Sequence, residues 1–185
     1  MNRRCVIFAG LAVPPHLCQD IGPQDVILAA DAGWKTARAL GFAPTLALGD
    51  FDTAPAPKGP DVLRLPAEKD DTDTFFAARK ALEMGCSEVL ILGGIGGRLD
   101  HTLANLQLFA AYSERGFYVT GIADGFAIRC VTGPDVFTLP DNVEKGTVSV
   151  FAANDRAEGV IERGLEYSLD DEPLTNRTSL GLSNE

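Results

Sequence analysis

The chain has 185 residues, of which 45% are hydrophobic and 23% charged, enough apolar material for one large domain or two small ones. Its 16 Lys and Arg against 26 Asp and Glu give a formal net charge of −10, and so acidic a surface repels nucleic-acid backbones and anionic membranes. The apolar content excludes disorder, and no apolar run reaches the roughly 20 residues that span a bilayer.

The first apolar run, residues 5–13, follows two arginines and has some features of a signal peptide. The run is short, however, and Pro14 and Pro15 stand where small residues would mark a cleavage site. We therefore predict a first buried β-strand. The four cysteines are scattered without a C-x-x-C pair, which predicts reduced thiols and a cytoplasmic location.

Strand-like and helix-like segments alternate from there to residue 124, which predicts a mostly parallel, three-layer α/β domain over residues 1–124. The helix over residues 72–84 should end at Gly85, and the apolar positions of the helix over 99–115 follow 3–4 spacing at Leu99, Leu103, Leu106 and Ala110. A proline-rich link occupies residues 54–60. The other predicted elements are strands over residues 26–30, 45–48, 62–65, 88–92 and 117–122 and a helix over 33–40.

The pattern changes after residue 124. Short β-prone runs at residues 126–131, 147–151 and 160–161 are separated by Gly, Pro, Asn and Asp, and we find no convincing helix. This pattern predicts a small antiparallel β domain over residues 125–185.

Pairs of carboxylates recur at strand and helix ends. Asp50 and Asp52 follow a strand directly, and Asp71 and Asp73 repeat the spacing near the next helix. Two carboxylates about 4 Å apart repel by roughly 4 kcal/mol at an effective dielectric near 20, so bringing the pairs together requires a cation, and oxygen-only ligands suit Mg²⁺. Asp31 is also expected at the carboxyl edge of the sheet, where ligands bind. The alternative is structural, with Asp71 as a helix cap and Asp52 in a turn.

A glycine-rich segment over residues 93–97 joins a strand to a helix, so its backbone N–H groups and the helix start can face an anion. Arg98 adds a forked cation suited to phosphate, Asp100 lies in the first turn, and His101 and Asn105 share a helix face. The alternative is a tight turn with Arg98 paired on the surface. With the carboxylates, this segment indicates a magnesium-dependent nucleotide enzyme.

These motifs resemble the thiamine pyrophosphokinase family. The chain differs at Ala32, where the family usually has Gly, and at Leu182, where Thr is frequent. Family members continue beyond the position of Glu185, so we expect the second domain to be incomplete. The resemblance is carried, in the family's order, by residues 30–33, 49–53, 70–73, 93–101 with Asn105, and 181–185.

The resemblance implies Mg²⁺-dependent transfer of a pyrophosphoryl group from ATP to the hydroxyl of thiamine, with release of AMP. It also implies a C-terminal β-sandwich and a homodimer that binds thiamine at the subunit interface.

By position, the resemblance assigns roles to eleven residues. Asp50, Asp52 and Asp73 would bind Mg²⁺. Arg98 would meet the ATP phosphates, and Asp73 or Asp100 would take the hydroxyl proton. The other implied binding residues are Asp31, Asp71, His101 and Asn105 around the nucleotide and metal, and Ser183 and Asn184 near thiamine.

Two other functions fit parts of the sequence. Asp50-Phe51-Asp52 also matches the D-x-D metal motif of nucleotide-sugar transferases. A non-catalytic relative that binds nucleotide or thiamine is the second alternative.

Overall fold

The computed structural model describes residues 3–52, 55–59, 61–139 and 145–185. Thr53 of the motif at 49–53, and residues 54 and 60 of the predicted link, lie outside them. The chain forms two units, unit 1 over Met1–Gly133 and unit 2 over Pro134–Glu185.

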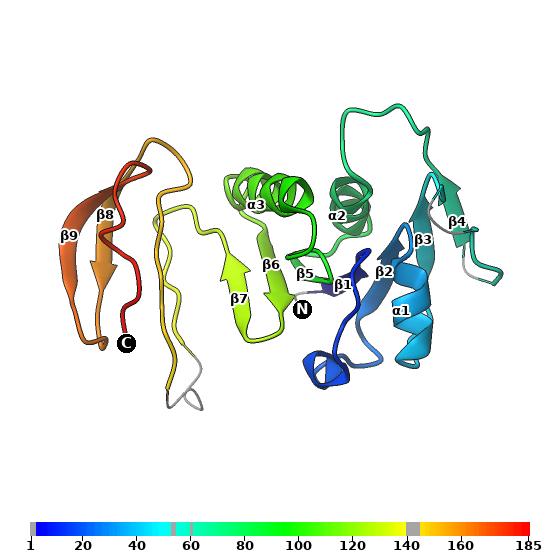
Figure 1. The fold of residues 1–185 in the computed structure, drawn as a ribbon, viewed down its shortest axis with the longest axis horizontal. Helices are drawn as coiled ribbons and strands as arrows, with labels where there is room; N and C mark the ends of the chain where they lie inside the picture. Colours follow the sequence, from blue (N-terminus) through cyan, green and yellow to red (C-terminus); the bar gives the residue numbers. More distant parts are fainter. Residues whose placement is uncertain (1–2, 53–54, 60, 140–144) are drawn as a thin grey trace. The chain divides into compact units, whose positions relative to one another are not determined.

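A seven-stranded sheet forms the centre of unit 1, with β1 (Arg4–Phe8) in its middle (Figure 1). Its order is β4-β3-β2-β1-β5-β6-β7, and every pair is parallel except β6 and β7. The mostly parallel sheet is therefore confirmed, and the carboxyl ends of its parallel strands share one edge. The remaining strands are β2 (Val26–Ala30), β3 (Leu46–Gly49), β4 (Asp61–Arg64), β5 (Glu88–Leu92), β6 (Tyr118–Ala123) and β7 (Phe126–Arg129).

Helices cover both faces of this sheet (Figure 1). Cys5 and Ile7 of β1 belong to the core that contains α2 (Asp73–Glu83) and α3 (Leu99–Ser113). Val6 and Phe8 belong to the opposite core, with α1 (Gly33–Ala39) and the 3-10 helix η1 (Pro15–Cys18). Burial on both faces explains why the strand is a continuous apolar run. All four cysteines are free thiols, as predicted.

The two longer helices differ from expectation in detail. Thr72, rather than Asp71, caps α2, because its Oγ1 accepts a hydrogen bond from the Phe75 N–H at 3.2 Å. In α3 the side chains of Leu99 and Leu103 are 71% and 52% exposed, whereas Leu108, Phe109 and Tyr112 are buried. The 3–4 spacing therefore identified the helix but not its core-facing side. No helix among the described residues is long and apolar enough to cross a membrane.

The predicted domain boundary at residue 124 falls within a hairpin of unit 1. Asp124 and Gly125 form the turn between β6 and β7, with Ala123 paired to Phe126. The change in sequence pattern therefore begins with the antiparallel edge strand of the large sheet, and unit 2 begins at Pro134.

Unit 2 contains an antiparallel pair, β8 (Arg156–Glu162) and β9 (Leu169–Thr175). Val148, in the predicted run 147–151, makes an isolated bridge to Asn184. The small antiparallel β unit is confirmed, and β9, which carries acidic residues and a proline, was not predicted.

Candidate active site

Two aspartates meet at the carboxyl edge of the sheet. Asp31 follows β2 and Asp50 follows β3, and these strands are parallel neighbours. The Asp31 N–H donates to the Leu48 carbonyl at 2.8 Å. A Cβ on Gly49 would lie 3.1 Å from Asp31 Cα, so the glycine permits the two strand ends to approach closely.

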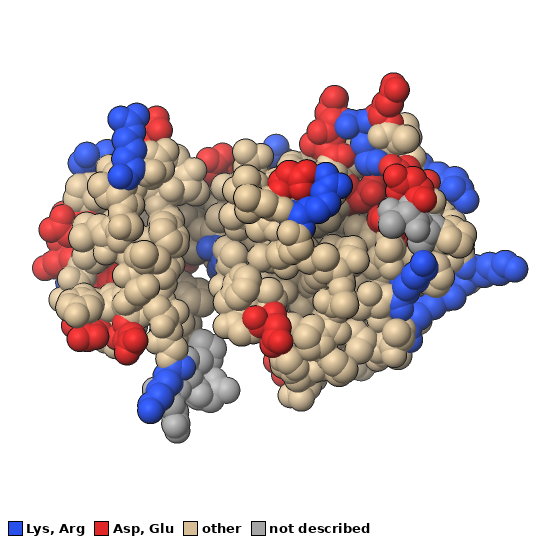
Figure 2. Space-filling view, viewed as in Figure 1, with Lys and Arg blue, Asp and Glu red and all other residues tan. Residues whose placement is uncertain are grey.

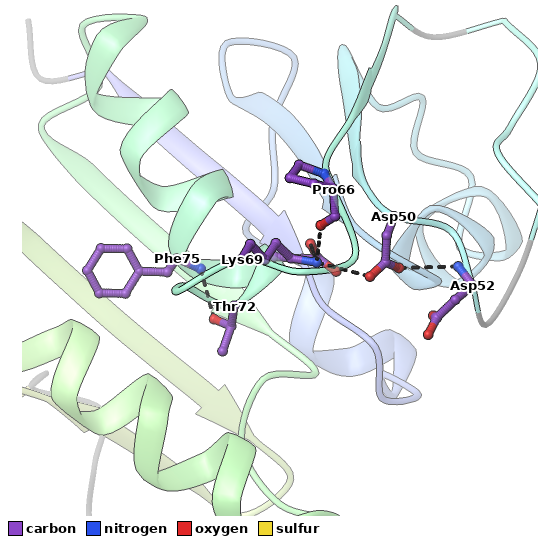
Figure 3. Close-up of polar contacts among 7 residues, drawn as sticks. Asp50, Asp52, Pro66, Lys69, Thr72 and Phe75 are labelled. Carbon is purple, nitrogen blue, oxygen red and sulfur yellow. Dashed lines mark hydrogen bonds and ion pairs between the residues drawn. The ribbon is translucent and has the colours of Figure 1, made fainter.

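Asp52 completes a cluster with these two residues. One carboxylate oxygen from each of Asp31, Asp50 and Asp52 lies within 4.8 Å of the others. The Asp52 N–H donates to Asp50 Oδ1 at 3.2 Å (Figure 3). Asp31 and Phe51 have φ values of 46° and 57°, a left-handed conformation that costs about 1–3 kcal/mol for a non-glycine residue. The surrounding fold therefore holds the backbone in a strained conformation at Asp31 and between Asp50 and Asp52.

Asp73, at the start of α2, reaches this cluster through a lysine that the sequence analysis missed. Lys69 Nζ lies 3.0 Å from Asp50 Oδ2 and 3.3 Å from Asp73 Oδ1, and it donates to the Pro66 carbonyl at 3.2 Å (Figure 3). The lysine side chain is only 11% exposed. Its position four residues before Asp73 was the available sequence signal.

Burial and neighbouring charges both shift the pKa values of Asp50, Lys69 and Asp73. Burial raises the pKa of Asp73 against the opposing effect of Lys69, and the negative charges of Asp50 and Asp31 raise it further. The hydrogen bond from Lys69 lowers the pKa of Asp50. Burial disfavours the charge on Lys69, but Asp50 and Asp73 outweigh it and raise the pKa of Lys69. One ammonium thus faces several carboxylates.

Two buried oxygens indicate that the cluster fits a hard cation. Asp31 Oδ1 and Asp73 Oδ1 are buried without a hydrogen-bond partner among the described residues. The 3.3 Å contact of Lys69 with Asp73 is a charge contact and lacks the alignment of a hydrogen bond. Oxygen donors with unused lone pairs are what Mg²⁺ requires.

Asp71 is turned toward α2. Its Oδ2 lies 3.8 Å from Arg79 Nη1, and it is not in the three-aspartate group found among the described residues.

Figure 2 shows acidic and basic side chains side by side over the region of β3, β4 and α2. Basic residues therefore partly balance the acidic residues on this face.

The glycine-rich segment follows β5 at the same edge of the sheet. A Cβ on Gly93 would lie 2.5 Å from the Leu11 carbonyl oxygen, so the loop lies directly against the chain that follows β1. Asn105 is buried and donates to the Gly94 carbonyl at 2.6 Å. Thr102 Oγ1 accepts from the Gly96 N–H at 3.0 Å. Asn105 and Thr102, the latter missed from sequence, therefore shape the loop from α3.

Arg98 stands at the start of α3 with its guanidinium exposed. Its Nη2 lies 2.5 Å from Asp100 Oδ2, and this pairing lowers the pKa of Asp100 to about 2. His101 is exposed, and its backbone N–H donates to Asp100 Oδ1 at 3.0 Å. The structure brings Arg98 and Asp100 together as a surface pair, which agrees with the structural alternative and leaves the guanidinium accessible.

The predicted thiamine residues lie near the end of unit 2. Ser183 has a φ of 59°, and its N–H donates to Ser149 Oγ at 3.0 Å. Asn184 is buried, and its amide donates to Glu162 Oε2 at 2.7 Å and to the Tyr167 carbonyl at 2.6 Å. Both N–H donors of Asn184 are thus used within unit 2, which gives this side chain a structural role.

Comparison with known proteins connects these features. Residues 19–120, more than half of the chain, match the family model described as "Thiamin pyrophosphokinase, catalytic domain". The chain belongs to the thiamin pyrophosphokinase family. The matched range contains the three-aspartate cluster, Lys69, Asp73 and the loop at 93–98, so the resemblance predicted from the motifs is confirmed.

Relatives in the thiamin pyrophosphokinase family extend the match. The thiamine pyrophosphokinase of Bacillus subtilis (strain 168) is 27% identical over an alignment of 165 positions, which covers 85% of this chain and 77% of the relative. A crystal structure of the thiamine pyrophosphokinase from Bacillus subtilis gives a TM-score of 0.87 at 26% identity, covering 99% of this chain and 89% of that one. The thiamin pyrophosphokinase of Geobacillus thermodenitrificans gives 0.78 at 25% identity, covering 98% and 87%. The chain is thus an enzyme of this kinase family.

Proposed function

We propose that the protein transfers the pyrophosphoryl group of ATP to the hydroxyl of thiamine and produces thiamine diphosphate and AMP, with Mg²⁺ as cofactor. The observation that carries this proposal is the cluster of Asp31, Asp50 and Asp52, with Asp73 joined through Lys69, inside the family's catalytic region. A polyphosphate brings further negative charge, which such a site accommodates only together with a cation.

In this proposal Asp50, Asp52 and Asp73 bind Mg²⁺ and Asp31 adds a fourth carboxylate. The buried Asp31 Oδ1, which has no hydrogen-bond partner among the described residues, and the buried Asp73 Oδ1, which has only the charge contact with Lys69, support the assignment. Bound Mg²⁺ would neutralise phosphate charge and orient the polyphosphate. Asp71, paired with Arg79, contributes to the charge around the site.

The chain's own residues would position the phosphates and handle the proton. Arg98 and the loop that Asn105 holds offer cationic and N–H donors at the start of α3, with His101 beside them. The thiamine oxygen bonds to the β-phosphorus, the bond from that phosphorus to the α–β bridging oxygen breaks, and AMP leaves. Asp73 and Asp100 are the two candidate proton acceptors, and the pairing with Arg98 lowers the pKa of Asp100.

For thiamine and for assembly, we propose that unit 1 is the catalytic unit and that Ser183 of unit 2 contacts thiamine. A homodimer with thiamine at the subunit interface would cover apolar side chains that unit 2 leaves exposed, such as Phe151, Ile161 and Tyr167. A cytoplasmic location agrees with the free thiols.

The decisive experiment is ³¹P NMR of the purified protein with ATP, Mg²⁺ and thiamine. We expect AMP and thiamine diphosphate to appear together. ADP in place of AMP would contradict pyrophosphoryl transfer. Tight binding of ATP or thiamine without turnover would favour a non-catalytic relative, and turnover of a nucleotide sugar instead would favour the D-x-D transferase.

Replacing Arg98 with alanine tests the phosphate assignment. We expect kcat to fall by about 10²–10³-fold, because a cation that meets developing phosphate charge stabilises the transition state. Steady-state AMP production measures this change. Arg156→Ala is the matched control, since Arg156 is also exposed and paired with a carboxylate two residues on, Glu158. Equal effects of the two substitutions would contradict the assignment.

A further inference from the structure

Lys69 occupies an unusual place for a lysine. Its ammonium contacts carboxylates from two separate elements, Asp50 after β3 and Asp73 at the start of α2, while only 11% of the side chain is exposed. In Figure 3 the ammonium points at the Asp50 carboxylate and at the Pro66 carbonyl. Lys69 therefore binds two of the three carboxylates assigned to Mg²⁺ above.

An ammonium and a divalent cation at the same carboxylates repel each other, so the two compete. Without a metal ion, Lys69 is the cation that offsets the repulsion between Asp50 and Asp73. Its third partner, the Pro66 carbonyl at 3.2 Å, belongs to the lysine's own loop. Lys69 can thus leave a carboxylate and keep one hydrogen bond.

We propose that Lys69 is an internal counter-ion that holds Asp50 and Asp73 together in the metal-free protein and is displaced from these carboxylates when the divalent cation binds. This inference rests on the metal site of the proposed function. It makes Lys69 a positioning residue that sets both the stability of the empty site and the affinity for metal.

The test compares Lys69→Met with the wild-type protein in the absence of nucleotide and thiamine. We expect Mn²⁺, measured by electron paramagnetic resonance, to bind about tenfold more tightly to the variant because the competing charge is gone. In EDTA the variant should unfold at a lower temperature, since the carboxylates then repel without compensation. Lys80→Met is the matched control, because Lys80 pairs with the exposed Glu83 on α2 and should leave both values unchanged.

Several outcomes would overturn the inference. Unchanged or weaker Mn²⁺ binding by Lys69→Met would show that the lysine does not compete with metal, and weaker binding is what a purely structural role predicts. Lys69→Arg keeps the charge and should retain most of the wild-type affinity. Wild-type protein that binds no Mn²⁺ would instead reject the metal site of the proposed function itself, and with it the role of Lys69.

A second measurement uses only the wild-type protein. Brief acetylation followed by mass spectrometry reports how reactive each lysine is. We expect the labelling of Lys69 to rise several-fold when Mg²⁺ is added, because displacement from the carboxylates exposes an amine whose side chain is otherwise only 11% exposed. Labelling of Lys80 should stay constant. No rise at Lys69 in a protein that binds Mg²⁺ would contradict displacement.

Discussion

Replacing Asp52 with asparagine is expected to reduce Mg²⁺-dependent production of thiamine diphosphate at least about a hundredfold while the protein remains folded. Asparagine keeps the size of the side chain and the backbone hydrogen bond to Asp50 but removes one of the three clustered charges. Mutual repulsion falls, so the free energy of unfolding should stay unchanged or rise slightly. Chromatography of the products measures turnover, and urea unfolding followed by circular dichroism measures the free energy of unfolding.

Asp61→Asn is the matched control for this substitution. Asp61 is an exposed carboxylate at the start of β4, so its replacement makes the same change in net charge away from the three-aspartate cluster. We expect wild-type turnover from the control. Wild-type turnover from Asp52→Asn would remove that residue from the metal site, and equal losses in both variants would indicate a general effect of charge.

Replacing Gly33 with alanine is expected to lower the free energy of unfolding by about 3 kcal/mol. A Cβ at this position would lie 2.0 Å from the carbonyl oxygen of Phe8, a completely buried residue of β1. Neither backbone can yield without moving α1 or the central strand. Gly33 is the first residue of α1, where alanine gains less than the roughly 1 kcal/mol that it brings to a helix interior, so the clash outweighs that gain. Urea unfolding followed by circular dichroism measures the loss.

Gly10→Ala provides the comparison, because a Cβ on Gly10 would meet no atom within 4 Å. Its free energy of unfolding should change by less than about 1 kcal/mol. A shift of α1 would also move Asp31, two residues before Gly33, so turnover by Gly33→Ala should fall as well. Equal stability of the two variants would show that α1 does not lie as close to β1 as described.

Buried parallel strands were the elements best predicted from sequence. The strands at residues 26–30 and 88–92 agree with β2 and β5 at both ends, because a strand buried on both faces is a continuous apolar run that stops where the chain leaves the sheet. Helix α2 was also predicted closely, through its cap at Thr72 and Gly85 with φ of 80°. Local signals determine these boundaries.

Features that depend on contacts between residues distant in sequence were predicted poorly. The apolar spacing of α3 did not identify its buried side, because the exposed Leu99 and Leu103 repeat at the same 3–4 spacing as the buried residues of the helix. Strand β7 has the composition of the region that follows it, and only its pairing with β6 assigns it to the large sheet. The contacts of the Asn184 amide with Glu162 and Tyr167 also depend on the fold, and the implied contact of this residue with thiamine stays a prediction.

The sequence by itself determined the α/β class, the carboxylates at strand ends and the family, since these depend on residue types and spacing along the chain. Only the tertiary structure showed that Lys69 links Asp73 to Asp50 at the carboxyl edge of the sheet. It also showed that Asp71 pairs with Arg79 instead. Charges interact through space, and the distances that decide which carboxylates share one cation exist only after the strands have paired and α2 has packed on them.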